Sequence, residues 1–112
     1  MIPDWVREFP GGVTVCDAAG TILYLNDVAA RTFAADGGAA LVGRSLLDCH
    51  PEAAAAKLRR LLATRQPNTY TIEKAGRWKL IHQAPWTEAG VFRGLVELSV
   101  EIPAVLPHFV RA

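Results

Sequence analysis

The stretch GVTVCDAAGTILYLND, residues 12–27, decides the fold. Two runs rich in β-branched residues are separated by Ala18-Ala19-Gly20, a pattern that is typical of a tight β-hairpin. The alanine-rich stretch that follows begins at Asn26 and Asp27, and either side chain can cap the first turn of a helix. The stretch therefore predicts two antiparallel strands that lead directly into a short helix.

A longer helix is predicted from about Pro51 to Arg65, because proline suits the first helical position, where an N–H group has no partner. The apolar stripe of this helix comprises Leu58, Leu61 and Leu62, and Ala54 and Ala55 extend it backwards. Three strands follow, with the sequences NTYTIEK, RWKLIHQAPW and VFRGLVELSVEI, and glycines at 76 and 90 mark the joins. Two strands, a helical middle and three strands predict an α+β fold with one antiparallel sheet.

The N-terminal segment has the spacing of a short amphipathic helix. Its apolar residues are Ile2, Trp5, Val6 and Phe9, and Pro10-Gly11-Gly12 then ends the pattern. We therefore expect an N-terminal helix over residues 1–10, a single domain over 11–102 and a C-terminal tail over 103–112.

The composition excludes several classes of partner. The 112 residues include 12 basic and 11 acidic side chains, which is not the charge of a nucleic-acid-binding or membrane-surface protein. The N-terminus lacks the pattern of a signal peptide, and no apolar run is long enough to cross a bilayer. We expect a cytoplasmic protein whose two cysteines, Cys16 and Cys49, are reduced rather than joined in a disulfide.

The order of these elements and several local strings resemble the PAS sensor domain. Residues 12–27 resemble the opening strand pair of the family, and GRSLLDCHPEAAAAKLRRLLATRQ is similar to its connecting turn and long helix. FRGLVELSVEI resembles the last strand, with Glu101-Ile102 where many members carry Asp-Ile-Thr. The resemblance covers residues 11–102 and implies a five-stranded antiparallel sheet with helices across one face.

The resemblance also implies two possible functions. Many PAS domains hold a small ligand, haem or flavin between the sheet and the long helix, whereas others are dimerisation modules without a known ligand. We expect a signal-transduction module, as in two-component signalling, that binds an unidentified ligand and passes the signal through a homodimer to an effector in cis or in trans. A ligand-free interaction module is the alternative. An enzyme is not expected, because no nucleophile, base and orienting group come together in the sequence.

The Cys49-His50 pair directly before Pro51 has two interpretations. In the first, Asp48 or His50 caps the long helix and Cys49 packs beneath it. In the second, His50 is an axial ligand of haem in a gas or redox sensor. The histidine of the best-known haem-binding PAS domains lies further along this helix, where Ala54 stands here, and this difference counts against a haem site of that type. The spacing of a zinc site is absent.

His82 is the second candidate histidine. If Ala89-Gly90 forms a two-residue hairpin loop, Glu88 faces Val91 and His82 falls opposite Glu97. This register places both on one sheet face together with Trp78, Leu80, Ala84, Leu95 and Ser99. The alternative is an exposed cross-strand pair without function. The residues that we expect to contact a ligand are Ala54, Leu58, Trp78, Leu80, His82, Glu97 and His50.

The other face of the last two strands is also apolar. The same register places on it Ile81, Val96, Leu98, Val100 and Ile102. The helices of the domain can cover only one face of a single sheet, so another surface must cover this one. The apolar stripe of Ile2, Trp5, Val6 and Phe9 is the candidate, and it can either pack on its own sheet or build a homodimer. We expect the homodimer.

Overall fold

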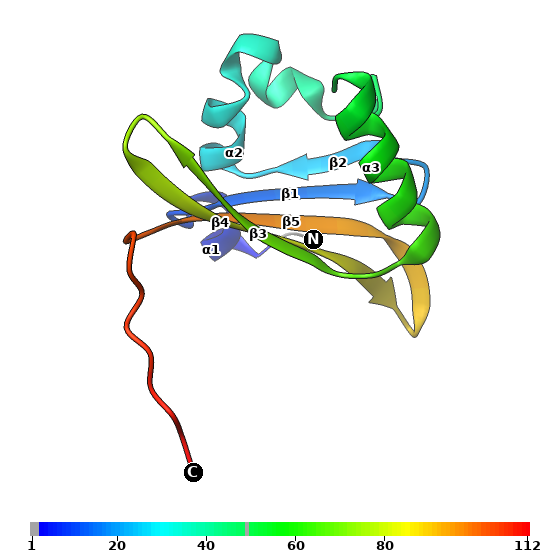
Figure 1. Cartoon of the computed structure of the whole chain (residues 1–112). Coiled ribbons are helices and arrows are strands. Elements are labelled where there is room, and N and C mark those ends of the chain that lie inside the picture. Colours follow the sequence, from blue (N-terminus) through cyan, green and yellow to red (C-terminus); the bar gives the residue numbers. More distant parts are fainter. Residues whose placement is uncertain (1–2, 49) are drawn as a thin grey trace.

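The computed structural model describes residues 3–48 and 50–112 and contains one five-stranded sheet with the order β2-β1-β5-β4-β3 (Figure 1). All neighbouring strands are antiparallel. The strands are β1 (Gly12–Asp17), β2 (Ile22–Leu25), β3 (Asn68–Lys74), β4 (Arg77–Glu88) and β5 (Val91–Ile102). The predicted α+β class and the antiparallel sheet are confirmed.

The helical segments lie on one face of the sheet, except for the first (Figure 1). That face is covered by α2 (Asp27–Thr32), the 3₁₀ turns η1 (Ala34–Asp36) and η2 (Gly38–Leu41), and α3 (Glu52–Thr64). The short helix α1 (Asp4–Arg7) lies on the opposite side of the sheet, and the tail after Ile102 extends away from the domain. Ile2, which we expected in the first helix, lies outside the described residues.

The leucine stripe of α3 packs against the sheet as predicted. Leu61 is buried together with Cys16 of β1 and Leu95 of β5, and Leu46 and Leu62 pack around this cluster. Ala55 is also buried, whereas the basic residues of the same helix are exposed. The helix is therefore held against the strands by one apolar edge, as its amphipathic pattern requires.

Asn26 joins the hairpin to the helical layer. Its Oδ1 accepts hydrogen bonds from the backbone N–H groups of Val13 and Ala29, and its Nδ2 donates to the carbonyl oxygens of Val6 and Gly11. The side chain is only 1% exposed. The prediction that Asn26 caps the helix is confirmed, and the same side chain also anchors the segment that carries α1.

The hairpin between β4 and β5 begins as predicted and then shifts by one residue. Ala89 and Gly90 both have positive φ angles, 50° and 80°, which is the backbone of a type I′ turn, and Glu88 faces Val91. A bulge follows, because Thr87 faces Phe92 but Trp86 faces Gly94. Side chains alternate between the two faces along a strand. The shift of one residue therefore places the later side chains of β5 on the opposite sheet face, relative to β4, from the one predicted.

The predicted pairing of His82 with Glu97 is therefore wrong. His82 faces Leu98, and Gln83 faces Glu97. The side chains on the helix-covered face of the two strands are Lys79, Ile81, Gln83, Leu95, Glu97 and Ser99, and those on the open face are Trp78, Leu80, His82, Ala84, Val96, Leu98, Val100 and Ile102. The prediction of which β5 side chains share a sheet face with which β4 side chains is therefore wrong.

Candidate functional site

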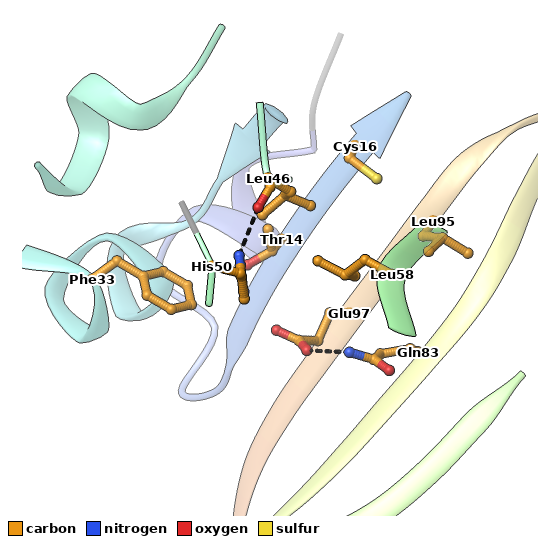
Figure 2. Close-up of a pocket in the computed structure, with 9 residues that line it drawn as sticks. All are labelled: Thr14, Cys16, Phe33, Leu46, His50, Leu58, Gln83, Leu95 and Glu97. Atoms are coloured by element: carbon orange, nitrogen blue, oxygen red, sulfur yellow. Dashed lines mark hydrogen bonds between the residues drawn. The ribbon is translucent and has the colours of Figure 1, made fainter. Parts of the chain in front are cut away.

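A chamber lies between the helical layer and the covered face of the sheet. It consists of three adjoining hollows of about 50, 220 and 210 Å³, all of which are lined by Thr14, Phe33 and His50. Figure 2 shows the residues around the first hollow, which come from the sheet, from α3, and from the segment between α2 and α3. They are Thr14, Cys16, Phe33, Leu46, His50, Leu58, Gln83, Leu95 and Glu97.

A row of polar side chains crosses three strands on the floor of this chamber. The amide of Asn68 on β3 donates a hydrogen bond to Oε1 of Gln83 on β4, at 2.8 Å. The amide of Gln83 in turn donates to Oε1 of Glu97 on β5, also at 2.8 Å (Figure 2). Asn68 holds Gln83 through the first bond, and Gln83 holds Glu97 through the second. The sheet therefore fixes the position of the Glu97 carboxylate.

The negative charge of Glu97 acts on its neighbours in the chamber. Burial raises the pKa of the Cys16 thiol, the hydrogen bond to the Leu95 backbone opposes this effect, and the charges of Asp17 and Glu97 add to it. Burial also raises the pKa of Tyr70, and the charge of Glu97 raises it further. Both groups therefore stay protonated at neutral pH.

His50 lines the chamber rather than capping α3. Its Nδ1 lies 2.7 Å from the carbonyl oxygen of Leu46 (Figure 2). Because a carbonyl oxygen only accepts, Nδ1 carries a proton, and in the neutral ring Nε2 is the acceptor. The N-cap of α3 is Pro51, which makes no side-chain capping bond. The capping role predicted for Asp48 or His50 is therefore wrong, and Cys49 lies outside the described residues.

The structure separates the expected ligand contacts into two groups. Leu58, Glu97 and His50 line the chamber. Ala54 is half-buried on α3 but is not among the lining residues of the hollows. Trp78, Leu80 and His82 lie on the open face of the sheet, where Nδ1 of His82 is 2.8 Å from Oγ1 of Thr69. The bulge in β5 is the reason for this separation.

Several lining residues were missed by the sequence analysis. They are Thr14, Cys16, Phe33, Leu46, Gln83 and Leu95. A signal for the strand residues was present, because Gly94 interrupts a predicted strand, and a glycine inside a strand often marks a bulge. A bulge at that point predicts Gln83, rather than His82, opposite Glu97.

The sheet order, the crossing helix and the chamber between them agree with a sequence match over most of the chain. Residues 6–105 match the family described as the PAS fold. The chain belongs to the PAS family. This confirms the resemblance in the sequence and extends it by a few residues at each end. Among curated proteins, none has a sequence that matches this PAS domain.

Solved structures of other PAS domains are similar in fold. The PAS domain of the histidine kinase ThkA has 18% identity and a TM-score of 0.64, with 80% of this chain and 96% of that chain covered. The Aer2 receptor of Vibrio cholerae, described as a dual PAS-haem oxygen sensor, has 21% identity and a TM-score of 0.64, covering 83% and 95%. The PAS domain of Bordetella pertussis BvgS has 22% identity and a TM-score of 0.61, covering 88% and 81%.

Two further features of the described residues bear on the site. No three His, Cys, Asp or Glu side chains in this part of the chain are grouped as metal ligands would be. None of the helices in the same residues has both the length and the hydrophobicity that crossing a bilayer requires.

Proposed function

We propose that this PAS domain is a sensor that binds a small organic ligand in the chamber between the sheet and the helical layer. Binding of the ligand would be transmitted through the sheet to its open face. The observation that carries this proposal is the fixed polar row ending at Glu97, opposite an apolar wall that includes Leu46 and Leu58. A few well-placed polar groups in an apolar hollow are the usual composition of a small-molecule site.

The size of the chamber limits the ligand. The three adjoining hollows, of about 50, 220 and 210 Å³, together reach only the lower part of the roughly 300–1,000 Å³ that sites for drug-sized molecules occupy. Haem is larger than most drug-sized ligands, so a chamber at the low end of this range does not suit a haem. A compact ligand with a single ring suits the space.

Filling the first hollow of the chamber, which Glu97 also lines, should weaken ligand binding. In Leu58→Trp, the larger side chain would occupy the first hollow, at an overpacking cost of about 1–3 kcal/mol that a folded domain can tolerate. We expect wild-type protein incubated with extract of its native cells to retain a small molecule, and Leu58→Trp to retain at least about tenfold less. Mass spectrometry of the molecules released on denaturation measures this.

Arg60→Trp is the matched control, because it adds the same side chain to an exposed position of α3. It should retain the ligand like the wild type. Equal retention by Leu58→Trp, or no retained molecule in the wild type, would contradict a ligand site in this chamber. The second outcome would favour the alternative function, a PAS domain that acts only through protein contacts.

The open face of the sheet is proposed as the output surface, where two copies of the chain associate. A hollow of about 410 Å³ on this face is lined by Val15, Leu23, Tyr24, Trp86 and Val96. Leu23 and Leu98 are 45% and 37% exposed, and Trp5 of α1, which stacks edge-on against Phe9, is 68% exposed. Apolar side chains that gather in this way usually mark an interface. The VqmA protein of Vibrio cholerae, similar in fold, is described as a dimer.

Replacement of Trp5 by alanine should weaken self-association. Interface tryptophans often contribute about 2 kcal/mol or more, so we expect the dimer dissociation constant to rise by at least about tenfold. Sedimentation velocity over a concentration series measures the constant. Phe109→Ala is the matched control, since Phe109 in the tail is 69% exposed and should not matter. A monomeric wild type, or an equal effect of both variants, would argue against this surface.

A further inference from the structure

We infer that the ligand of the chamber is a small organic cation, a protonated nitrogen base with an attached apolar ring, and that its nitrogen pairs with Glu97. This inference rests on the proposed function, because it names the class of ligand for the same site. Three properties of the chamber carry it: an uncompensated carboxylate, a second acceptor on the helical side, and an apolar wall between them.

The first property is that Glu97 has no cationic partner. None of the ion pairs between described residues includes its carboxylate, and its hydrogen bond from Gln83 comes from a neutral amide. Lys79 also lines the third hollow but forms no ion pair with it. A half-buried carboxylate that forms no ion pair is costly, and a bound cation offsets that cost.

The second property is that the remaining polar groups of the chamber also favour a cation. His50 presents Nε2 as an acceptor in its neutral form, because its Nδ1–H bonds to Leu46. Asp36 adds another carboxylate at the second hollow. The thiol of Cys16 and the phenol of Tyr70 are both held in their protonated forms, in part by the charge of Glu97. Lys79 lines only the third hollow, so an anionic ligand in the first two would meet no lysine or arginine among the described residues and would be repelled by the carboxylates of Glu97 and Asp36.

The third property is the apolar wall that an attached ring would contact. Phe33, Leu46, Leu58 and Leu95 surround the first hollow together with the polar groups (Figure 2). A ring on this wall and a nitrogen at the floor would use both surfaces. An inorganic cation would contact only the polar floor, and the described residues offer no group of metal ligands.

The test compares three probes of similar shape and different charge. Phenethylamine is a cation at neutral pH, 2-phenylethanol is neutral and phenylacetate is an anion. Side-chain amide signals in nitrogen-15 NMR spectra are suitable reporters, because the chain has only four such groups, Asn26, Gln66, Asn68 and Gln83, and two belong to the polar row. Titration of each probe gives its dissociation constant and shows whether it reaches Glu97.

We expect phenethylamine to shift the signals of Asn68 and Gln83 and to bind at least about tenfold more tightly than the other two probes. Glu97→Gln keeps the size and the hydrogen bond acceptor but removes the charge, and it should abolish this preference. Asp36→Asn, which removes the other carboxylate, should keep most of the preference for phenethylamine.

The outcomes separate this inference from the proposed function. Tighter binding of 2-phenylethanol or phenylacetate at the same signals would overturn the cation and leave the sensor function intact. A preference for phenethylamine that persists in Glu97→Gln would overturn the role of Glu97. Failure of all three probes to shift these signals would overturn a small aromatic amine as ligand, while retention of another molecule in the extract experiment would still support the chamber as a binding site.

Discussion

Replacing Gly94 by alanine is expected to lower the free energy of unfolding by at least about 3 kcal/mol, above the usual range for overpacked sites. A Cβ atom at this position would lie 1.9 Å from the carbonyl oxygen of Cys16 and 2.7 Å from the carbonyl carbon of Asp17. Both atoms belong to the backbone of β1, which is paired with β5 at this point. They cannot move away without breaking the ladder between the two strands.

The same substitution would disturb a contact that crosses β5. Trp86 on β4 faces Gly94, and its indole Nε1 donates a hydrogen bond to the carbonyl oxygen of Cys16 on β1, at 3.0 Å. The indole spans the intervening strand there because Gly94 has no side chain. We therefore expect loss of this bond as well as the clash. Urea denaturation followed by circular dichroism gives the change in stability.

Gly76→Ala is the control for the backbone conformation. Gly76 has a φ of 75° but its added Cβ would meet nothing within 4 Å. Only the strain of a left-handed residue remains, and this costs about 1–2 kcal/mol. If Gly94→Ala were no more destabilising than Gly76→Ala, the close approach of β1 and β5 at the bulge would not be the reason for glycine at position 94.

Replacing Asn26 by alanine is the second large expected effect, a loss of about 3–4 kcal/mol. Alanine would leave the N–H groups of Val13 and Ala29 and the carbonyl oxygens of Val6 and Gly11 without their side-chain partner. Each buried polar group left unpaired costs about 1–3 kcal/mol, and water can reach some of the four. Such a loss is a large part of the roughly 5–15 kcal/mol that stabilises a domain.

Hydrogen exchange distinguishes this mechanism from a general loss of packing. In Asn26→Ala, the amides of Val13 and Ala29 should lose protection beyond the change in global stability, because they lose their acceptor. Asn68→Ala is the matched control, since Asn68 is half-buried and its side chain makes one hydrogen bond, to Gln83. It should cost about 1 kcal/mol. Equal effects at the two asparagines would show that Asn26 does not anchor the helical layer.

These two positions connect the fold to the proposed site. Gly94 sets the register that turns Glu97 and Gln83 toward the chamber, and Asn26 fixes α2, which leads into Phe33 on the chamber wall. Variants that change ligand binding should therefore be compared at equal stability. Glu97→Gln and Leu58→Trp change the chamber without touching either position.

The elements of the fold could be predicted from local sequence because each is specified by short-range patterns. The β-branched runs of the hairpin, the cap at Asn26 and the leucine stripe after Pro51 each act within a few residues. The two-residue loop at Ala89-Gly90, which the sequence analysis took as a condition, does form, since its turn type depends only on those residues and their neighbours.

The members of the site could not be predicted in the same way, because they depend on which strand residues face each other. Leu58, Glu97 and His50 were expected at the site and line the chamber. Trp78, Leu80 and His82 were grouped with Glu97 on one sheet face and lie on the other. Side chains alternate along a strand, so a single extra residue between the turn and Gly94 reverses the assignment of everything beyond it. His50 was assigned a capping role because its bond to Leu46 depends on how the chain folds before α3.

The sequence by itself determined the class of fold, the order of the strands along the chain and the apolar face of α3, since these follow from local propensity and periodicity. Only the tertiary structure decided the order of strands in the sheet, the bulge at Gly94 and the row from Asn68 through Gln83 to Glu97. The physical reason is that hydrogen bonds between strands, and the close approach of β1 to a glycine on β5, join residues that are distant in the sequence.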